Sequence, residues 1–84
     1  MVVHGELDIA TAPELTRLLA RLRAHGHPVT LDLAEVTFID STGLSALMDA
    51  HFESERNGWE FSVRNPSPAV LRVVALAGMG EVLT

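Results

Sequence analysis

One stretch, Phe38 to Met48, constrains the fold of this chain more than any other segment. An apolar run ends there at Asp40 and Ser41, and apolar residues then recur at three- and four-residue spacing, as they do on one face of a helix. Aspartate and serine are typical helix N-caps, because their side-chain oxygens accept backbone N–H groups that the first turn leaves unpaired. We therefore predict an extended segment that enters a helix through a short polar connection.

This polar connection places two hydroxyl groups, those of Ser41 and Thr42, at the positive end of the helix dipole. Gly43 adds little bulk, so a partner could approach the connection closely. Capping alone is the ordinary explanation of such a segment, and capping is compatible with a further role. The case for a functional site therefore depends on whether other parts of the chain point to the same place.

The rest of the chain alternates between strand and helix patterns. Alternating apolar and polar residues predict strands at residues 1–7, 29–33 and 59–64. Apolar spacing with start and stop signals predicts helices at about 11–26, 41–57 and 67–77, with Thr11 and Ser67 as N-caps. Residues 81–84 could form a terminal strand or a frayed tail. Because the strands alternate cleanly, we expect helices over one face of a small α/β sheet and a more polar opposite face.

Composition narrows the classes of function. Eighty-four residues form one domain, and six basic against eleven acidic residues argue against a nucleic-acid binder. No apolar run approaches the length of a membrane span, and Glu6 and Asp8 interrupt the first apolar stretch, so neither a membrane segment nor a signal peptide is expected. The chain has no cysteine, which fits the reducing cytoplasm and excludes thiolate metal sites.

Three segments, in this order and at this spacing, resemble the STAS domain of bacterial anti-sigma factor antagonists. They are Gly5–Asp8, Asp40–Leu44 and Ser67–Val70. In that family the first segment closes an early strand, the second carries a phosphorylated serine, and the third opens a later helix. The resemblance covers nearly all of the chain and implies one STAS domain over residues 1–84, with a mixed β-sheet and helices packed mainly on one face. Relatives usually have another strand before this point, so the resemblance also implies an open sheet edge and a monomer or weak dimer.

The resemblance implies a switch without catalysis and without a cofactor. An anti-sigma factor that is also a serine kinase would bind the unphosphorylated protein, which would free a sigma factor for transcription. Phosphorylation would map onto Ser41, with Thr42 as a minor site, and a PP2C-type phosphatase would reset the switch. The residues implied to meet the partner are Asp8, Asp40, Ser41, Thr42, Gly43 and Leu44.

Some roles and functions stay open at this point. Asp40 could cap the helix, orient the serine hydroxyl or meet the partner, and Asp8 could be a turn residue or a partner contact. A STAS domain could also act as an unphosphorylated scaffold, as a sensor or as part of a transporter. A small hydrolase using Ser41 or Ser45 is the alternative from another class, but the sequence has no Gly-x-Ser-x-Gly elbow. It also has no Gly-rich phosphate loop for ATP and no recognisable metal-ligand set around its four histidines.

Overall fold

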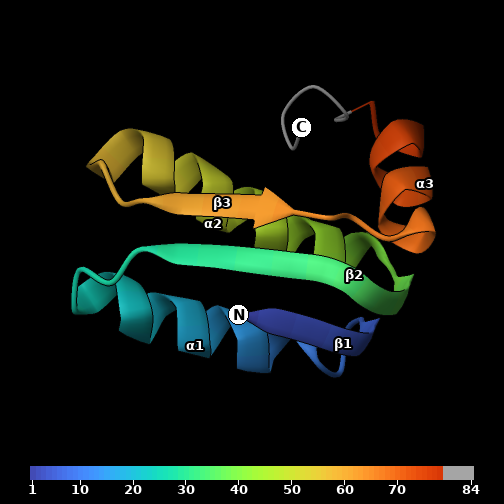
Figure 1. The fold of residues 1–84 in the computed structure, drawn as a ribbon, viewed down its shortest axis with the longest axis horizontal. Helices are drawn as coiled ribbons and strands as arrows, with labels where there is room; N and C mark the ends of the chain where they lie inside the picture. The colour runs from blue at the N-terminus through green and yellow to red at the C-terminus, as the bar shows by residue number, and fades with distance from the viewer. Residues whose placement is uncertain (79–84) are drawn as a thin grey trace.

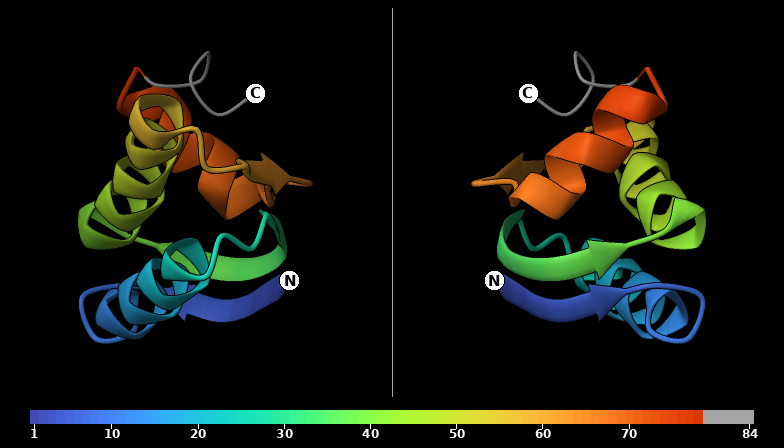
Figure 2. Two further views of the ribbon diagram at one scale, coloured as in Figure 1. Left: turned by 90° about the vertical axis from the view of Figure 1, so that its left-hand side faces the viewer. Right: turned by 90° about the vertical axis from the view of Figure 1, so that its right-hand side faces the viewer.

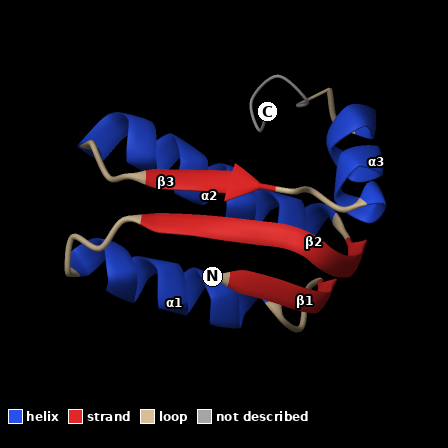
Figure 3. Ribbon diagram, viewed as in Figure 1, coloured by secondary structure: helices blue, strands red, loops and turns tan. Residues whose placement is uncertain are grey.

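The computed structural model describes residues 1–78, in which strands and helices alternate along the chain (Figure 1; Figure 3). The elements are β1 (Val2–Leu7), α1 (Ala12–Ala24), β2 (Val29–Ile39), α2 (Ser41–Asn57), β3 (Phe61–Arg64) and α3 (Pro68–Leu76). The predicted helices are confirmed, and α2 has the predicted bounds. The terminal strand or tail considered for residues 81–84 lies outside the described residues.

The three described strands form one sheet in the order β1-β2-β3, and both neighbouring pairs are parallel. The prediction of a small α/β fold is confirmed, but within residues 1–78 the sheet is parallel throughout instead of mixed. Each strand is joined to the next by a helix, which carries the chain back to the end of the sheet where the previous strand began. As a result, all three strands end at the same edge of the sheet.

All three helices lie on the same side of the sheet (Figure 2), as the sequence predicted. Helices α1 and α2 run side by side across it, and α3 packs on β2. The buried core lies between these helices and the inward-facing strand residues. Its most deeply buried side chains are Leu7, Leu31, Leu33, Leu47 and Val70.

The other face of the sheet is polar. Thr30 and Ser62 form a hydrogen bond across neighbouring strands at 3.0 Å, and the Asn65 amide donates to Asp32 at 3.2 Å. The backbone N–H of Ala34 and the Asn65 amide lower the pKa of the exposed Asp32 carboxyl. These interactions confirm the predicted polar face opposite the helices.

Strand β2 is longer than predicted, because its alternation breaks after Leu33. Ala34 and Glu35 are both exposed, and so are Thr37 and Phe38, while the intervening Val36 is buried. The register between β1 and β2 shifts twice in this region, and Gly5 of β1 has a φ of 82°. A bulge changes which residues of a strand face the core. A prediction based on strict alternation therefore ends the strand too early.

The last of the three family-like segments also follows its predicted local structure. The Ser67 side chain accepts a hydrogen bond from the Val70 backbone N–H at 3.3 Å and caps α3. The Ser67 backbone N–H donates to the Leu33 carbonyl at 3.2 Å, which attaches the start of α3 to β2. The segment is therefore a structural anchor for the last described helix.

Candidate functional site

Two of the three family-like segments meet where β1 and β2 end, and we call this region the tip, comprising residues 8–11 and 40–43. Leu7 and Ile39, the last residues of the two strands, are register partners, and the Asp40 N–H donates to the Leu7 carbonyl at 3.2 Å. The connection from β1 into α1 therefore lies beside the start of α2 (Figure 1). Segments far apart in the sequence are brought together because parallel strands end at the same edge.

Asp40 joins the two halves of the tip. One carboxylate oxygen accepts the Gly43 backbone N–H at 2.9 Å, and the other accepts the Ile9 backbone N–H at 3.2 Å. The first contact is the predicted N-cap of α2, and the extended backbone of Asp40 suits it. The second contact was not predicted, because nothing in the local sequence links residue 40 to residue 9.

Asp8 organises the other half of the tip. Its side chain accepts the backbone N–H groups of Ala10 at 3.0 Å and Thr11 at 3.1 Å, and its carbonyl accepts that of Ala12 at 2.7 Å. Thr11 holds the predicted N-cap position of α1, but its side chain does not cap the helix, since its hydroxyl accepts the Asp8 N–H and donates to the Glu6 carbonyl, both at 2.9 Å. Asp8 is thus a turn residue in the connection that precedes α1.

Ser41 and Thr42 are the first two residues of α2, and both are exposed. Their position at a helix N-terminus favours negative charge, because unpaired N–H groups and the helix dipole are directed toward it. Ser45, one turn further along, is exposed as well. The tip can therefore present a hydroxyl nucleophile or phosphate acceptor to a partner, in a setting that tolerates an added phosphate.

Gly43 and Leu44 have a different place from the other predicted site residues. Leu44 is 7% exposed and belongs to the core, and Gly43 is buried against the end of β1. A Cβ built on Gly43 would lie 2.1 Å from the Leu7 carbonyl oxygen. In the unbound molecule these two residues are buried and support the tip from the side of the core. Their direct contact with a partner stays a prediction.

Two substitutions of Asp40 test how much its two hydrogen bonds contribute to the stability of the fold. We expect Asp40→Ala to lower the free energy of unfolding by about 2 kcal/mol, because the variant loses a helix cap and leaves the Ile9 N–H without its acceptor. Asp40→Asn should cost less, because its single amide oxygen can still accept one of the two N–H groups. Urea unfolding followed by circular dichroism measures both. Wild-type stability in Asp40→Ala would show that the carboxylate contacts add nothing to stability.

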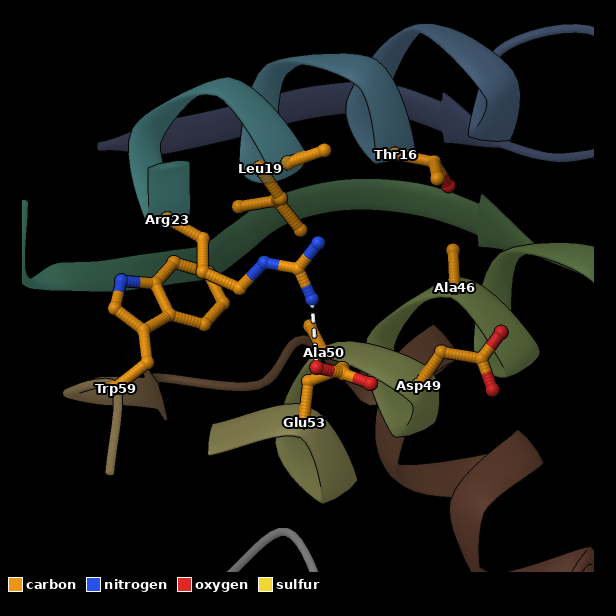
Figure 4. A pocket seen from close by; sticks show the side chains of 9 residues that line it. Thr16, Leu19, Arg23, Ala46, Asp49, Ala50, Glu53 and Trp59 are labelled. Atoms are coloured by element: carbon orange, nitrogen blue, oxygen red, sulfur yellow. Dashed lines mark hydrogen bonds and ion pairs between the residues drawn. The ribbon is translucent and has the colours of Figure 1, made fainter. Parts of the chain in front are cut away.

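A hollow between α1 and α2 is the other feature considered as a site (Figure 4). Arg23 reaches across it to Glu53 at 2.6 Å, beside the indole of Trp59, and Leu19 and Ala50 contribute apolar surface. Its volume is about 100 Å³, against roughly 300 to 1,000 Å³ for common ligand pockets. We therefore interpret it as a packing seam between two helices, and the tip remains the candidate site.

The histidines give the hydrolase alternative no support. His51 lies ten residues along α2 from Ser41, about 15 Å of helix axis, and its ring contacts Glu55 at 2.6 Å. His25 and His27 follow the far end of α1, whose other end is at the tip. Within residues 1–78, no three His, Asp or Glu side chains gather in a way that could hold a metal ion.

The fold and the tip together define a small parallel α/β domain with an exposed hydroxyl at a helix N-terminus. A family model described as "Mlab, STAS domain" matches residues 1–84, and the chain therefore belongs to the STAS domain family. None of the described helices has the length and apolar character needed to cross a membrane.

Several named proteins that are similar to this chain in sequence are anti-sigma-B factor antagonists. The chain is 32% identical to an anti-sigma-B factor antagonist from Staphylococcus epidermidis, over 96% of this chain and 76% of that protein. It is 26% identical to the anti-sigma-B factor antagonist of Bacillus subtilis (strain 168), over 96% of this chain and 74% of that protein. Its fold is similar to that of the anti-sigma factor antagonist SpoIIAA in its unphosphorylated form. That match has a TM-score of 0.78 and 24% identity, and it covers 99% of this chain and 74% of the other.

Proposed function

We propose that this protein is an anti-sigma factor antagonist that binds an anti-sigma factor through the tip. The observation that carries the proposal is Ser41, an exposed serine at the first position of α2, on a tip whose shape Asp8 and Asp40 fix. The sequence similarity to anti-sigma-B factor antagonists supports the choice of partner. In this role the protein is a regulator and a kinase substrate, it works in the cytoplasm, and it catalyses no reaction.

The proposed switch is phosphorylation of Ser41 by the same anti-sigma factor. The serine oxygen would attack the γ-phosphorus of ATP held by that kinase, ADP would leave, and the hydroxyl proton would pass to a base of the kinase. The product carries about −1.5 to −2 charges at a surface that must lose its water when the partner docks. Binding then weakens through the cost of desolvation, without refolding. A PP2C-type phosphatase would remove the phosphate and restore binding.

Ser41 variants test this proposal. We expect wild type and Ser41→Ala to bind the cognate anti-sigma factor with similar affinity in the presence of ADP. Ser41→Asp and the phosphorylated protein should bind roughly 100-fold more weakly. Titration calorimetry measures the affinities, and intact mass after incubation with ATP reports phosphate on wild type but not on Ser41→Ala.

Stability serves as the control for these variants. Asp40 caps α2, so neither substitution at Ser41 should change the free energy of unfolding by more than about 0.5 kcal/mol. Equal affinity of all three unphosphorylated proteins, together with phosphate on another residue, would remove Ser41 as the switch. A folded wild type that does not bind would overturn the antagonist role and leave a STAS scaffold or sensor.

A further inference from the structure

Ile9 is an isoleucine at the tip with 73% of its surface exposed. It lies in the connection between β1 and α1, and its side chain is not part of the buried core. Its backbone is nevertheless held in place, because its N–H donates to the Asp40 carboxylate at 3.2 Å. On either side, Asp8 fixes the turn by accepting the N–H groups of Ala10 and Thr11. Ile9 is thus an apolar side chain presented to solvent from an ordered backbone.

The surroundings of Ile9 are those of the proposed switch. Asp40, which accepts the Ile9 N–H, directly precedes Ser41 in the chain. The neighbouring exposed residues Ala10, Ser41 and Thr42 carry no charge. Both Asp8 and Asp40 direct carboxylate oxygens at backbone N–H groups of the tip. Ile9, Ala10, Ser41 and Thr42 are thus uncharged exposed residues beside two carboxylates that are hydrogen-bonded to the backbone of the tip.

We propose that Ile9 is the apolar anchor of the tip, and that it inserts into an apolar depression on the anti-sigma factor; this rests on the proposed function above. Apolar side chains that become fully desolvated at the centre of an interface carry much of its binding energy. A phosphate on Ser41 would lie beside the seated Ile9, so the partner could not bury the isoleucine without also desolvating the phosphate. The anchor therefore explains why a local charge would release the partner.

Asp40 is a positioning residue for this anchor. Its two oxygens join the Ile9 N–H to the first turn of α2, which keeps Ile9 and Ser41 in one fixed arrangement. An anchor on a pre-ordered loop loses less conformational freedom on binding than one on a mobile loop. Asp40→Asn can satisfy only one of the two N–H groups, so it should weaken binding through the position of Ile9.

A graded series at Ile9 tests the anchor by titration calorimetry against the cognate anti-sigma factor. Each buried methylene contributes about a fourfold change in affinity, so we expect Ile9→Val to lose roughly fourfold and Ile9→Ala roughly 10- to 100-fold. Leu76→Ala is the matched control, since Leu76 is 83% exposed on α3 and lies outside the tip. It should bind as wild type does.

A double-mutant cycle tests the positioning role of Asp40. If Asp40 acts through Ile9, the protein carrying both Ile9→Ala and Asp40→Asn should lose little more affinity than Ile9→Ala alone. Hydrogen exchange should also show faster exchange of the residue 9 amide in Asp40→Asn. Losses that multiply, with unchanged exchange, would overturn the positioning role.

The same titrations separate the two proposals. If wild type binds, Ser41→Asp does not, and Ile9→Ala binds as wild type does, the anchor is wrong and the antagonist role stands. If wild type does not bind at all, the antagonist role fails and the anchor fails with it. An equal loss for Ile9→Ala and Leu76→Ala would also overturn the anchor, because it would show a general dependence on exposed apolar surface.

Discussion

Gly43→Ala should destabilise the protein by about 3 kcal/mol or more, a large fraction of the total stability of a domain of this size. The added Cβ would lie 2.1 Å from the Leu7 carbonyl oxygen and 2.8 Å from its carbon, and both belong to backbone. No change of rotamer can relieve such a contact, so α2 must move away from the end of β1. Urea unfolding followed by the fluorescence of Trp59, the single tryptophan of the chain, measures the loss.

Gly58→Ala is the matched control, because it makes the same chemical change without the clash. Gly58 ends α2 with a φ of 70°, and within residues 1–78 nothing lies within 4 Å of an added Cβ. Its cost comes only from the left-handed backbone, roughly 1 to 2 kcal/mol. If Gly43→Ala unfolded at the same urea concentration as Gly58→Ala, the close approach of α2 to β1 would not be a rigid feature of the fold.

Gly43 also shows which features could be predicted from the sequence and which could not. From the sequence, the small size of Gly43 suggested room for an approaching partner. In the fold, the group that approaches Gly43 is the Leu7 carbonyl of the chain itself. The two residues are thirty-six positions apart, and no local pattern connects them. The requirement for glycine at this position follows only from the packing of α2 on β1.

Local signals explain what was predicted correctly. The bounds of α2 follow from Asp40, whose side chain caps the first turn, and from Gly58, which adopts the left-handed conformation after the last. Both residues act within a few positions of the helix end, so the sequence carries the information. The long-range bond from the Ile9 N–H to Asp40 depends on the parallel pairing of β1 with β2, and it was therefore missed.

The Thr11 hydroxyl at the start of α1 shows a different limit. Both residue types cap helices well, and they lie only three positions apart. Asp8 accepts the N–H groups of Ala10 and Thr11, and this leaves the Thr11 hydroxyl to bond the end of β1. The sequence placed Thr11 correctly at the N-cap position, but the partners of its hydroxyl, the Asp8 N–H and the Glu6 carbonyl, could not be predicted from its residue type.

Leu47→Ala is the second change with a large expected effect, and we expect it to lower the free energy of unfolding by about 2 to 5 kcal/mol. Leu47 has no exposed surface and lies on α2 within the core. Alanine is the better helix former, so the loss would come from the cavity and the missing apolar contacts, not from helix propensity. Urea unfolding measured beside wild type gives the difference directly.

Leu47→Met is the control that replaces the leucine without leaving the cavity expected in Leu47→Ala. Methionine nearly conserves the volume, so this variant should lose less than about 1.5 kcal/mol. Ser41 is the first residue of α2, and Leu47 lies in its second turn. The packing of Leu47 in the core therefore helps to fix the position of Ser41. The Met variant should keep wild-type affinity for the anti-sigma factor. If it folded stably but bound ten times more weakly, the tip would be sensitive to core packing as well as to its own hydrogen bonds.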